Sequence, residues 1–142
     1  MKKIIALKGK SRSGKTSTIK ILHELLGENG FTQTEFTKIK YGDFIAVFSK
    51  NDKKIGITST GDTYNLVLSA LQNLINENKC NICVCACRTI DRITPGTKDA
   101  ILEFSNYKPQ FVEKTIDNNE STQETTNNKD AKLLPDSITK SI

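Results

Sequence analysis

Long apolar runs are absent from this chain of 142 residues. No window approaches the roughly 18–20 consecutive apolar residues that a membrane-spanning helix needs. The stretch 2–7 joins two lysines to a short apolar run, which falls below the roughly 7–15 apolar residues of a secretory signal. We therefore expect a cytoplasmic protein without membrane contact, whose four cysteines are reduced thiols rather than a disulfide framework.

Apolar and aromatic side chains are also scarce. Hydrophobic residues make up 36% of the chain and aromatic residues 6%, and there is no tryptophan. A globular chain is typically about 45–50% apolar with glycine included. The shortage is concentrated in residues 117–130, DNNESTQETTNNKD, which cannot offset an ordering cost of roughly 1–2 kcal/mol per residue. The sequence therefore predicts one domain over residues 1–115 and a polar, disordered tail over 116–142.

Within residues 1–115, strand and helix signals alternate. Short apolar runs indicate strands, and apolar residues at helical spacing indicate helices. The expected strands are 3–7, 43–48, 54–60, 81–87 and 110–115, and the expected helices are 16–26, 62–78 and 94–107. In the last helix, Thr94 would be the cap and Pro95 a first-turn residue. This order predicts an α/β fold of three layers, with helices on both faces of a mostly parallel sheet and one antiparallel hairpin strand at or near an edge.

A loop bracketed by glycines is the strongest signal in the sequence. Residues 9–16 read GKSRSGKT, which fits the pattern G-x-x-x-x-G-K-[ST] between an expected strand and an expected helix. Glycines let backbone N–H groups wrap around an anion, and the helix adds the positive end of its dipole. Lys15 can bridge phosphate oxygens, and the Thr16 hydroxyl can ligate Mg²⁺. The residues expected to bind a nucleotide are Gly9, Lys10, Ser11, Arg12, Ser13, Gly14, Lys15, Thr16 and Ser17.

This motif resembles that of the P-loop NTPase superfamily, and the resemblance covers roughly residues 1–115. It implies a P-loop NTPase-like fold that binds Mg²⁺ and a nucleoside triphosphate. Lys10 coincides with the signature lysine of the branch with the deviant loop G-K-G-G-x-G-K-[ST], where that lysine reaches the partner's nucleotide across a dimer. Ser11 and Arg12 replace the next two glycines here, so we favour the alternative that Lys10 is a local charge that attracts anions.

A second metal ligand is expected after the strand 54–60. The run IGITSTGD ends in small residues and Asp62, and an acid at this place can bind Mg²⁺ directly or through water. Asp62 is equally well placed to cap the helix that follows, so both roles stay open. Asp43 is a weaker candidate for contact with a metal or an acceptor substrate. The hydroxyls that could contribute to the same pocket as Asp62 belong to Thr58, Ser59 and Thr60.

Two arginines follow the strand 81–87. Arg88 comes directly after it and emerges at the carboxyl end of the sheet, where open α/β sheets bind ligands. Arg92 lies in the same loop, and guanidinium groups suit phosphate oxygens and transition-state charge. The alternative for both is a solvated basic loop. The catalytic candidates are therefore Lys15, Asp62, Arg88 and Arg92.

The cysteines and the single histidine are expected to pack in the core or lie exposed rather than react. Cys83, Cys85 and Cys87 alternate along a strand and share one face, while Cys80 falls on the other face or before the strand. Four thiolates so placed cannot converge on one zinc ion, and free cysteines behave as small hydrophobes. His23 lies in the middle of an expected helix.

The sequence therefore predicts a protein that binds Mg²⁺ and ATP and hydrolyses the ATP. ATP is preferred over GTP because the guanine pattern N-K-x-D is missing after a late strand; residues 78–81 read NKCN and precede one. A small-molecule or nucleotide kinase, with loop 88–96 as a short lid, is the alternative enzyme. A nucleotide-gated adaptor whose tail recruits a protein partner is a non-catalytic alternative.

The net charge of +5 also raises the question of nucleic acid. Residues 1–115 carry 18 basic and 11 acidic side chains, and residues 116–142 carry 3 and 5. Three of the basic side chains, Lys10, Arg12 and Lys15, belong to the phosphate loop, and the others are scattered. Nucleic acid is therefore a minor alternative to a nucleotide.

Overall fold

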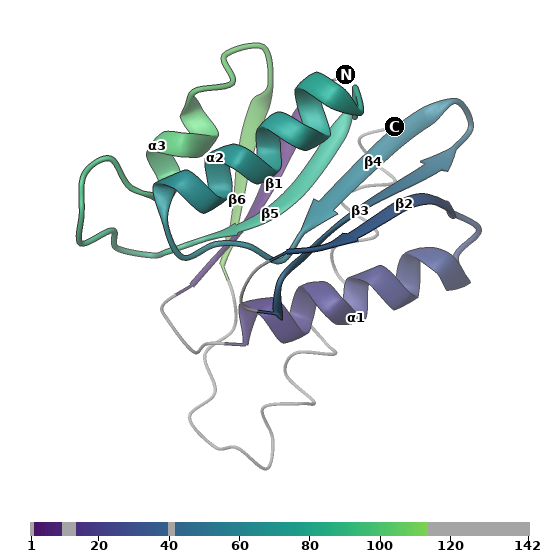
Figure 1. The fold of residues 1–142 in the computed structure, drawn as a ribbon, viewed down its shortest axis with the longest axis horizontal. Coiled ribbons are helices and arrows are strands. Elements are labelled where there is room, and N and C mark those ends of the chain that lie inside the picture. Colours follow the sequence, from purple (N-terminus) through teal and green to yellow (C-terminus); the bar gives the residue numbers. More distant parts are fainter. Residues whose placement is uncertain (1, 10–13, 40–41, 114–142) are drawn as a thin grey trace.

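The structure, a computed structural model, describes residues 2–9, 14–39 and 42–113. The loop positions Lys10, Ser11, Arg12 and Ser13 and the expected tail, together with the other residues from 114 onward, lie outside the described residues. The elements are β1 (Lys3–Lys8), α1 (Lys15–Glu28), β2 (Thr32–Lys38), β3 (Phe44–Lys50), β4 (Lys53–Thr58), α2 (Tyr64–Gln72), the π-helix η2 (Asn73–Glu77), β5 (Ile82–Cys87), α3 (Thr97–Leu102) and β6 (Lys108–Glu113). The α/β class is confirmed (Figure 1).

One six-stranded sheet has the order β2-β3-β4-β5-β1-β6. Pairing is parallel between β4 and β5, β5 and β1, and β1 and β6. Strand β3 runs antiparallel to both of its neighbours, β2 and β4. The expected antiparallel hairpin strand is therefore confirmed. Asn51 and Asp52 form its two-residue turn to β4, both with positive φ, which suits the twist of a hairpin.

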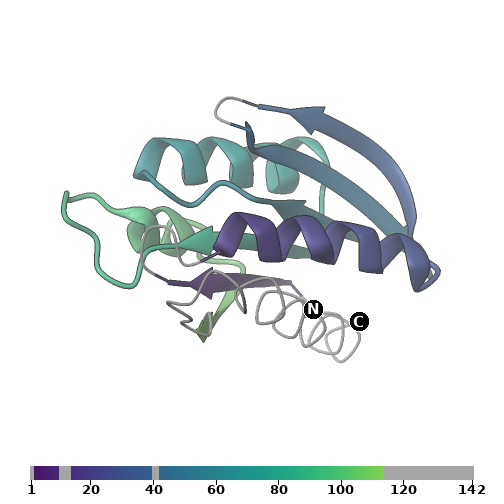
Figure 2. The same ribbon diagram turned by 90° about the horizontal axis from the view of Figure 1, so that it is seen from below.

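Helices cover both faces of the sheet. Alternate residues of β1 divide between two clusters, in which Ile5 and Leu7 join the α1 residues and Ile4 and Ala6 join residues of α2 and α3. Figures 1 and 2 show α1 on one side of the strands and α2 and α3 on the other. Strand β5 is buried along its whole length between these layers, as expected for a parallel strand covered on both faces.

The edge strand β2 was not expected from the sequence. Its seven residues, TQTEFTK, are all exposed and show no continuous apolar run. It forms because it pairs with β3 in a register that sets Phe36 opposite Ala46 and Lys38 opposite Phe44. Cross-strand packing of this kind stabilises a strand whose own pattern is weak.

Two expected helices are shorter than predicted. Helix α2 begins at Tyr64, and its last turn is the π-helix η2. Helix α3 begins at Thr97 after Gly96 rather than after Thr94, so the predicted cap and the first-turn Pro95 are wrong. Gly96 N donates instead to Asp99 Oδ2 at 2.7 Å, which fixes the helix start two residues later than the Thr-Pro signal suggested.

Candidate functional site

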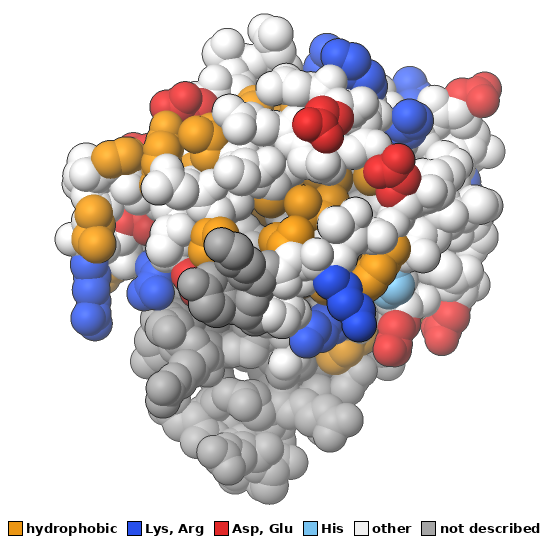
Figure 3. Space-filling model, viewed as in Figure 1, with side chains coloured by type: hydrophobic (Ala, Val, Ile, Leu, Met, Phe, Trp, Pro, Cys, Tyr) orange, Lys and Arg blue, Asp and Glu red, His pale blue; other side chains and the backbone are white. Residues whose placement is uncertain are grey.

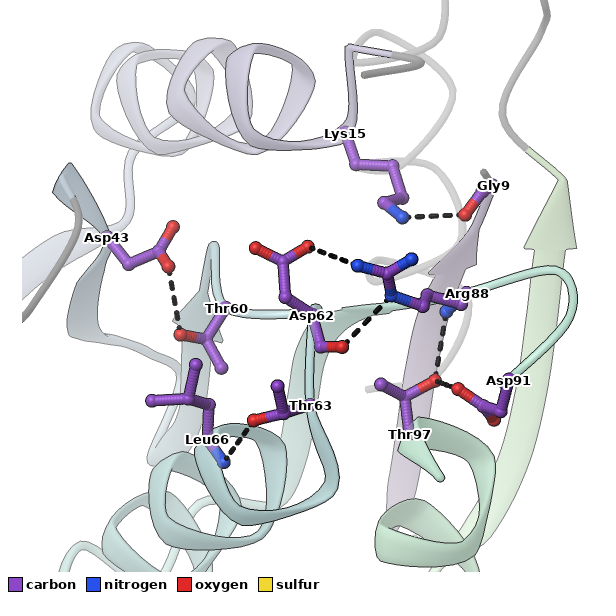
Figure 4. A network of polar contacts seen from close by, with 10 residues as sticks. All are labelled: Gly9, Lys15, Asp43, Thr60, Asp62, Thr63, Leu66, Arg88, Asp91 and Thr97. Atoms are coloured by element: carbon purple, nitrogen blue, oxygen red, sulfur yellow. Dashed lines mark hydrogen bonds and ion pairs between the residues drawn. The ribbon is translucent and has the colours of Figure 1, made fainter. Parts of the chain in front are cut away.

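The parallel strands β4, β5 and β1 are neighbours and end at the same edge of the sheet. The segments that follow them meet at this edge: Gly9 follows β1, Arg88 follows β5, and Asp62 lies in the turn between β4 and α2. Lys15, the first residue of α1, reaches the same place (Figure 4). We call Gly9, Lys15, Asp62 and Arg88 the strand-end site. Ligands of open α/β sheets bind in the crevice outside such carboxyl ends.

Lys15 is buried at the start of α1. Gly14 precedes it with a φ of 91°, a left-handed conformation that glycine adopts without strain. The Lys15 side chain turns back across the loop, and its Nζ donates to the Gly9 carbonyl at 2.6 Å. Burial lowers the pKa of Lys15, and the negative charge of Asp62 partly offsets this. The ammonium group is therefore held in a poorly solvated place, where an anion would be a favourable partner.

Arg88 and Asp62 connect the ends of β5 and β4. Arg88 Nε donates to the Asp62 carbonyl at 3.0 Å, and its guanidinium lies 3.9 Å from Asp62 Oδ1. Thr63, not Asp62, caps α2, because Thr63 Oγ1 accepts from Leu66 N at 3.3 Å. The cap interpretation of Asp62 is therefore wrong. The Asp62 side chain is 61% exposed and accessible to a ligand.

Gly61 allows the turn before Asp62 to approach β5 closely. A Cβ at position 61 would lie 2.5 Å from Ala86 Cβ and 2.8 and 2.9 Å from the Ala86 carbonyl carbon and oxygen. Ala86 N also donates to the Thr60 carbonyl at 3.3 Å. This close packing fixes where Asp62 meets Arg88.

The loop after β5 is organised by Asp91. Thr97 Oγ1 donates to Asp91 Oδ1 at 2.7 Å and accepts from Arg88 N at 3.0 Å, while Lys98 N donates to Asp91 Oδ2 at 3.2 Å. Burial acts to raise the pKa of Asp91, but these hydrogen bonds from Thr97 and Lys98 outweigh it and lower the pKa. No spacing rule in the sequence links Asp91 to Thr97, so this role was missed.

A cavity of about 620 Å³ lies between the start of α2 and this loop. Asp62, Arg88, Asp91 and the exposed Arg92 all line it. The structure therefore brings both predicted arginines to one cavity beside the strand-end site. Arg88 is anchored there by Asp62, whereas no hydrogen bond or ion pair joins the Arg92 side chain to another described residue.

Asp43 lies at the start of β3 and is only 8% exposed. Ser59 Oγ donates to Asp43 Oδ1 at 2.8 Å, and Thr60 Oγ1 donates to Asp43 Oδ2 at 3.2 Å. The hydroxyls of Ser59 and Thr60 are thus directed to Asp43 rather than to the pocket of Asp62, and Thr58 Oγ1 accepts from Thr60 N. Asp43 joins the turn after β4 to β3.

A second cavity, of about 590 Å³, opens between α1 and the strands β2 and β3. We call it the aromatic pocket; the lining residues that matter below are Lys20, His23, Phe36, Lys38, Asp43 and Phe44. The His23 ring lies 5.3–5.5 Å from those of Phe36, Phe44 and Phe48, so its predicted packing role is confirmed. Figure 3 shows hydrophobic, basic and acidic side chains gathered around the single histidine. Sequence reasoning missed this pocket because it missed β2.

The cysteines are buried, as predicted. Cys80 precedes β5, and all four lie in the cluster on the side of α2 and α3. Burial raises the pKa of Cys87 to about 11 and that of Cys85 further. The thiols of Cys85 and Cys87 are therefore protonated packing groups at neutral pH.

The strand-end site has oxygen ligands of the kind that Mg²⁺ prefers. In the described part of the chain, no three His, Cys, Asp or Glu side chains group closely enough to hold a metal by themselves. A nucleotide-bound Mg²⁺ needs only one or two protein ligands, because phosphates and waters supply the others. The accessible carboxylate of Asp62 fits that requirement, and Thr16, next to Lys15 in α1, is the other ligand that the sequence predicts.

Comparisons of the chain with family models, curated proteins and solved structures found no match. Among the described residues, no helix is long and apolar enough to cross a membrane.

Proposed function

We propose that this chain is a P-loop NTPase-like protein that binds a nucleoside triphosphate with Mg²⁺ at the strand-end site and hydrolyses its γ-phosphate. One observation carries the proposal. The buried Lys15 follows the left-handed Gly14 at the start of a 14-residue helix and reaches back to Gly9 at the end of β1. Gly9, Gly14 and Lys15 are the first glycine, the second glycine and the lysine of the GKSRSGKT motif. They lie in the strand-loop-helix context that the motif requires.

The electrostatics of the site support a polyanionic ligand. Lys15 is desolvated, and α1 begins without a side-chain cap, so its first N–H groups and its dipole can act on a phosphate. Arg88 and Arg92 add guanidinium groups at the neighbouring cavity. On binding, Lys15 would exchange the Gly9 carbonyl for phosphate oxygens, and the arginines would stabilise charge that develops during hydrolysis.

Thr16 and Asp62 would hold the Mg²⁺ ion. The ion would neutralise phosphate charge and orient the terminal phosphate. Asp62 is positioned for this by Gly61 and by its contacts with Arg88. We expect ATP rather than GTP, and a cytoplasmic setting, on the sequence grounds given above.

Calorimetric titration with ATP and GTP, with and without Mg²⁺, tests the proposal. Replacing Lys15 with Met keeps an apolar chain of similar length but removes the ammonium group, so triphosphate affinity is expected to fall about tenfold to a hundredfold. Lys108→Met, at an exposed position of β6, is the matched control and is expected to bind like the wild type. Absence of binding by any nucleotide, or equal affinity in the two variants, would contradict the proposal.

A phosphotransferase is a second candidate, which the aromatic pocket favours. Asp43 lines that pocket, and it also contacts the turn that leads to Asp62. A second small molecule bound in the pocket would therefore lie next to the turn that carries Asp62. Phosphate release from ATP without any acceptor supports hydrolysis. Release only with an added small molecule, together with a phosphorylated product, supports transfer.

A further inference from the structure

The aromatic pocket contains a ring that ordinary core packing does not account for. Phe44 is buried and Phe48 almost fully so, yet Phe36 is 44% exposed. Phe36 stacks on Phe44 with a centroid separation of 5.5 Å and an interplanar angle of 18°. His23 packs edge-on against both rings and hydrogen-bonds Gln33 Oε1 through Nε2, which holds β2 against α1. Phe36 therefore presents aromatic surface from a fixed position.

Two lysines lie at one end of this pocket. Helix α1 starts at the edge where the parallel strands end, and it rises about 1.5 Å per residue away from that edge. Lys20 is therefore nearer the edge than Glu24, the acid that also lines the pocket. Lys38 is the last residue of β2 and pairs with Phe44 at the same edge. Among the described residues neither lysine has an ion-pair partner.

Asp43, the acid at this end, is already satisfied. Both of its oxygens accept hydroxyl hydrogen bonds, from Ser59 and Thr60. Asp43 is also buried, whereas Lys20 and Lys38 are exposed and form no ion pair with another described residue. The edge end of the pocket therefore favours an anionic group, and the end toward Phe36 favours a ring.

We infer that the aromatic pocket binds a small organic anion built on a flat aromatic ring, with the ring against Phe36 and the anionic group between Lys20 and Lys38. A cavity of about 590 Å³ is of the size that holds small molecules, and such sites combine apolar walls with a few polar groups. A flat ring can pair with Phe36 in an offset-stacked or edge-on arrangement. Binding there does not require the proposed nucleotide site, so loss of that proposal leaves this one standing.

Three probes separate the contributions of ring and charge. They are 2-naphthoate, its neutral counterpart 2-naphthylmethanol, and cyclohexanecarboxylate, which keeps the charge without the aromatic ring. Each is titrated into the full chain without nucleotide and followed by amide chemical shifts. We expect 2-naphthoate to bind best and to shift amides of β2, β3 and the middle of α1. Shifts confined to other elements would overturn the inference.

Matched variants test the named side chains. Phe36→Leu removes the aromatic ring but keeps an apolar side chain. This variant is expected to lower the affinity for 2-naphthoate about threefold or more. The double variant Lys20→Gln, Lys38→Gln is expected to lower the affinity for 2-naphthoate about fivefold. Its affinity for 2-naphthylmethanol should not change. The controls are Phe111→Leu and Lys108→Gln on β6, the opposite edge of the sheet, where Phe111 is similarly exposed at 38%.

Two results would overturn the assignment. One is an equal loss of affinity for 2-naphthoate in Phe36→Leu and Phe111→Leu, which would mean that the probe contacts aromatic rings non-specifically. The other is unchanged binding of 2-naphthoate in the double lysine variant while its melting curve matches the wild type. Because no probe carries phosphate and no ATP is present, these outcomes are independent of whether Lys15→Met affects nucleotide binding.

Discussion

The parallel half of the sheet, strands β4, β5, β1 and β6, differs from the antiparallel half, strands β2 and β3, in how it positions polar groups. In the parallel half, β5 is buried along its whole length. Hydrogen bonds join the segments after its strands, from Thr89 N to the Gly9 carbonyl and from Arg88 Nε to the Asp62 carbonyl. In the antiparallel half, β2 is exposed along its whole length and carries Phe36 and Lys38 into an open pocket. The buried strand β5 thus fixes the positions of the residues that follow it. The exposed edge strand β2 instead lines one side of a cavity.

Replacing Gly61 is expected to lower the free energy of unfolding more than the other variants do. Gly61 lies in the parallel half, at a place where two segments pack closely. Gly61→Ala forces a Cβ into the Ala86 backbone and should lower the free energy of unfolding by about 3 kcal/mol. Gly27→Ala is the control: no atom lies within 4 Å of its added Cβ, and it sits in α1, so it should stabilise slightly. Chemical denaturation measures both. Equal stabilities of the two variants would show that the close approach at position 61 is not required.

Asp43 joins the two halves, and its replacement should have an intermediate effect. Asp43→Asn weakens the hydrogen bonds from Ser59 and Thr60 and should lower the free energy of unfolding by about 1–2 kcal/mol. Asp52→Asn is the matched control, because position 52 is exposed in the hairpin turn and has a positive φ that Asn tolerates. If both variants unfold at the same denaturant concentration as the wild type, Asp43 does not stabilise the junction.

The smallest expected effect concerns the loop held by Asp91. The folded pKa of Asp91 is lowered, so the charged carboxylate stabilises the folded loop above the unfolded pKa and loses this contribution as the pH falls through the folded value. Between about pH 6 and about pH 3, the wild type should therefore lose more stability than Asp91→Asn. Amide hydrogen exchange over residues 88–98 at the two pH values measures the local effect. The same pH dependence in both proteins would argue against this role.

The fold of the parallel half could be predicted because its central strands, β1 and β5, are continuous apolar runs. Residues such as Ile82 and Val84 are buried on one face and Cys83 and Cys85 on the other, so the burial of β5 is visible in its composition. Gly9, Gly14, Lys15 and Thr16 follow a motif whose spacing is itself the signal.

What the sequence did not predict depends on contacts between distant residues. Strand β2 becomes a strand through its pairing with β3, and the aromatic pocket follows from that pairing. Asp91 holds Thr97 across a loop, and no local pattern contains this contact. Thr63 caps α2 instead of its neighbour Asp62; both residue types are common helix caps, so the sequence alone did not separate them.

Amide chemical shifts during titration of the full chain with Mg²⁺ and ATP show whether a nucleoside triphosphate binds at the strand-end site. We expect saturable shifts of the amides of Gly9, Gly14 and Lys15 and of the amides around Asp62 and Arg88. The chemical shifts of the β2 amides should not change. Absence of saturable shifts at Gly14 and Lys15, or shifts confined to β2 and β3, would contradict binding at this site.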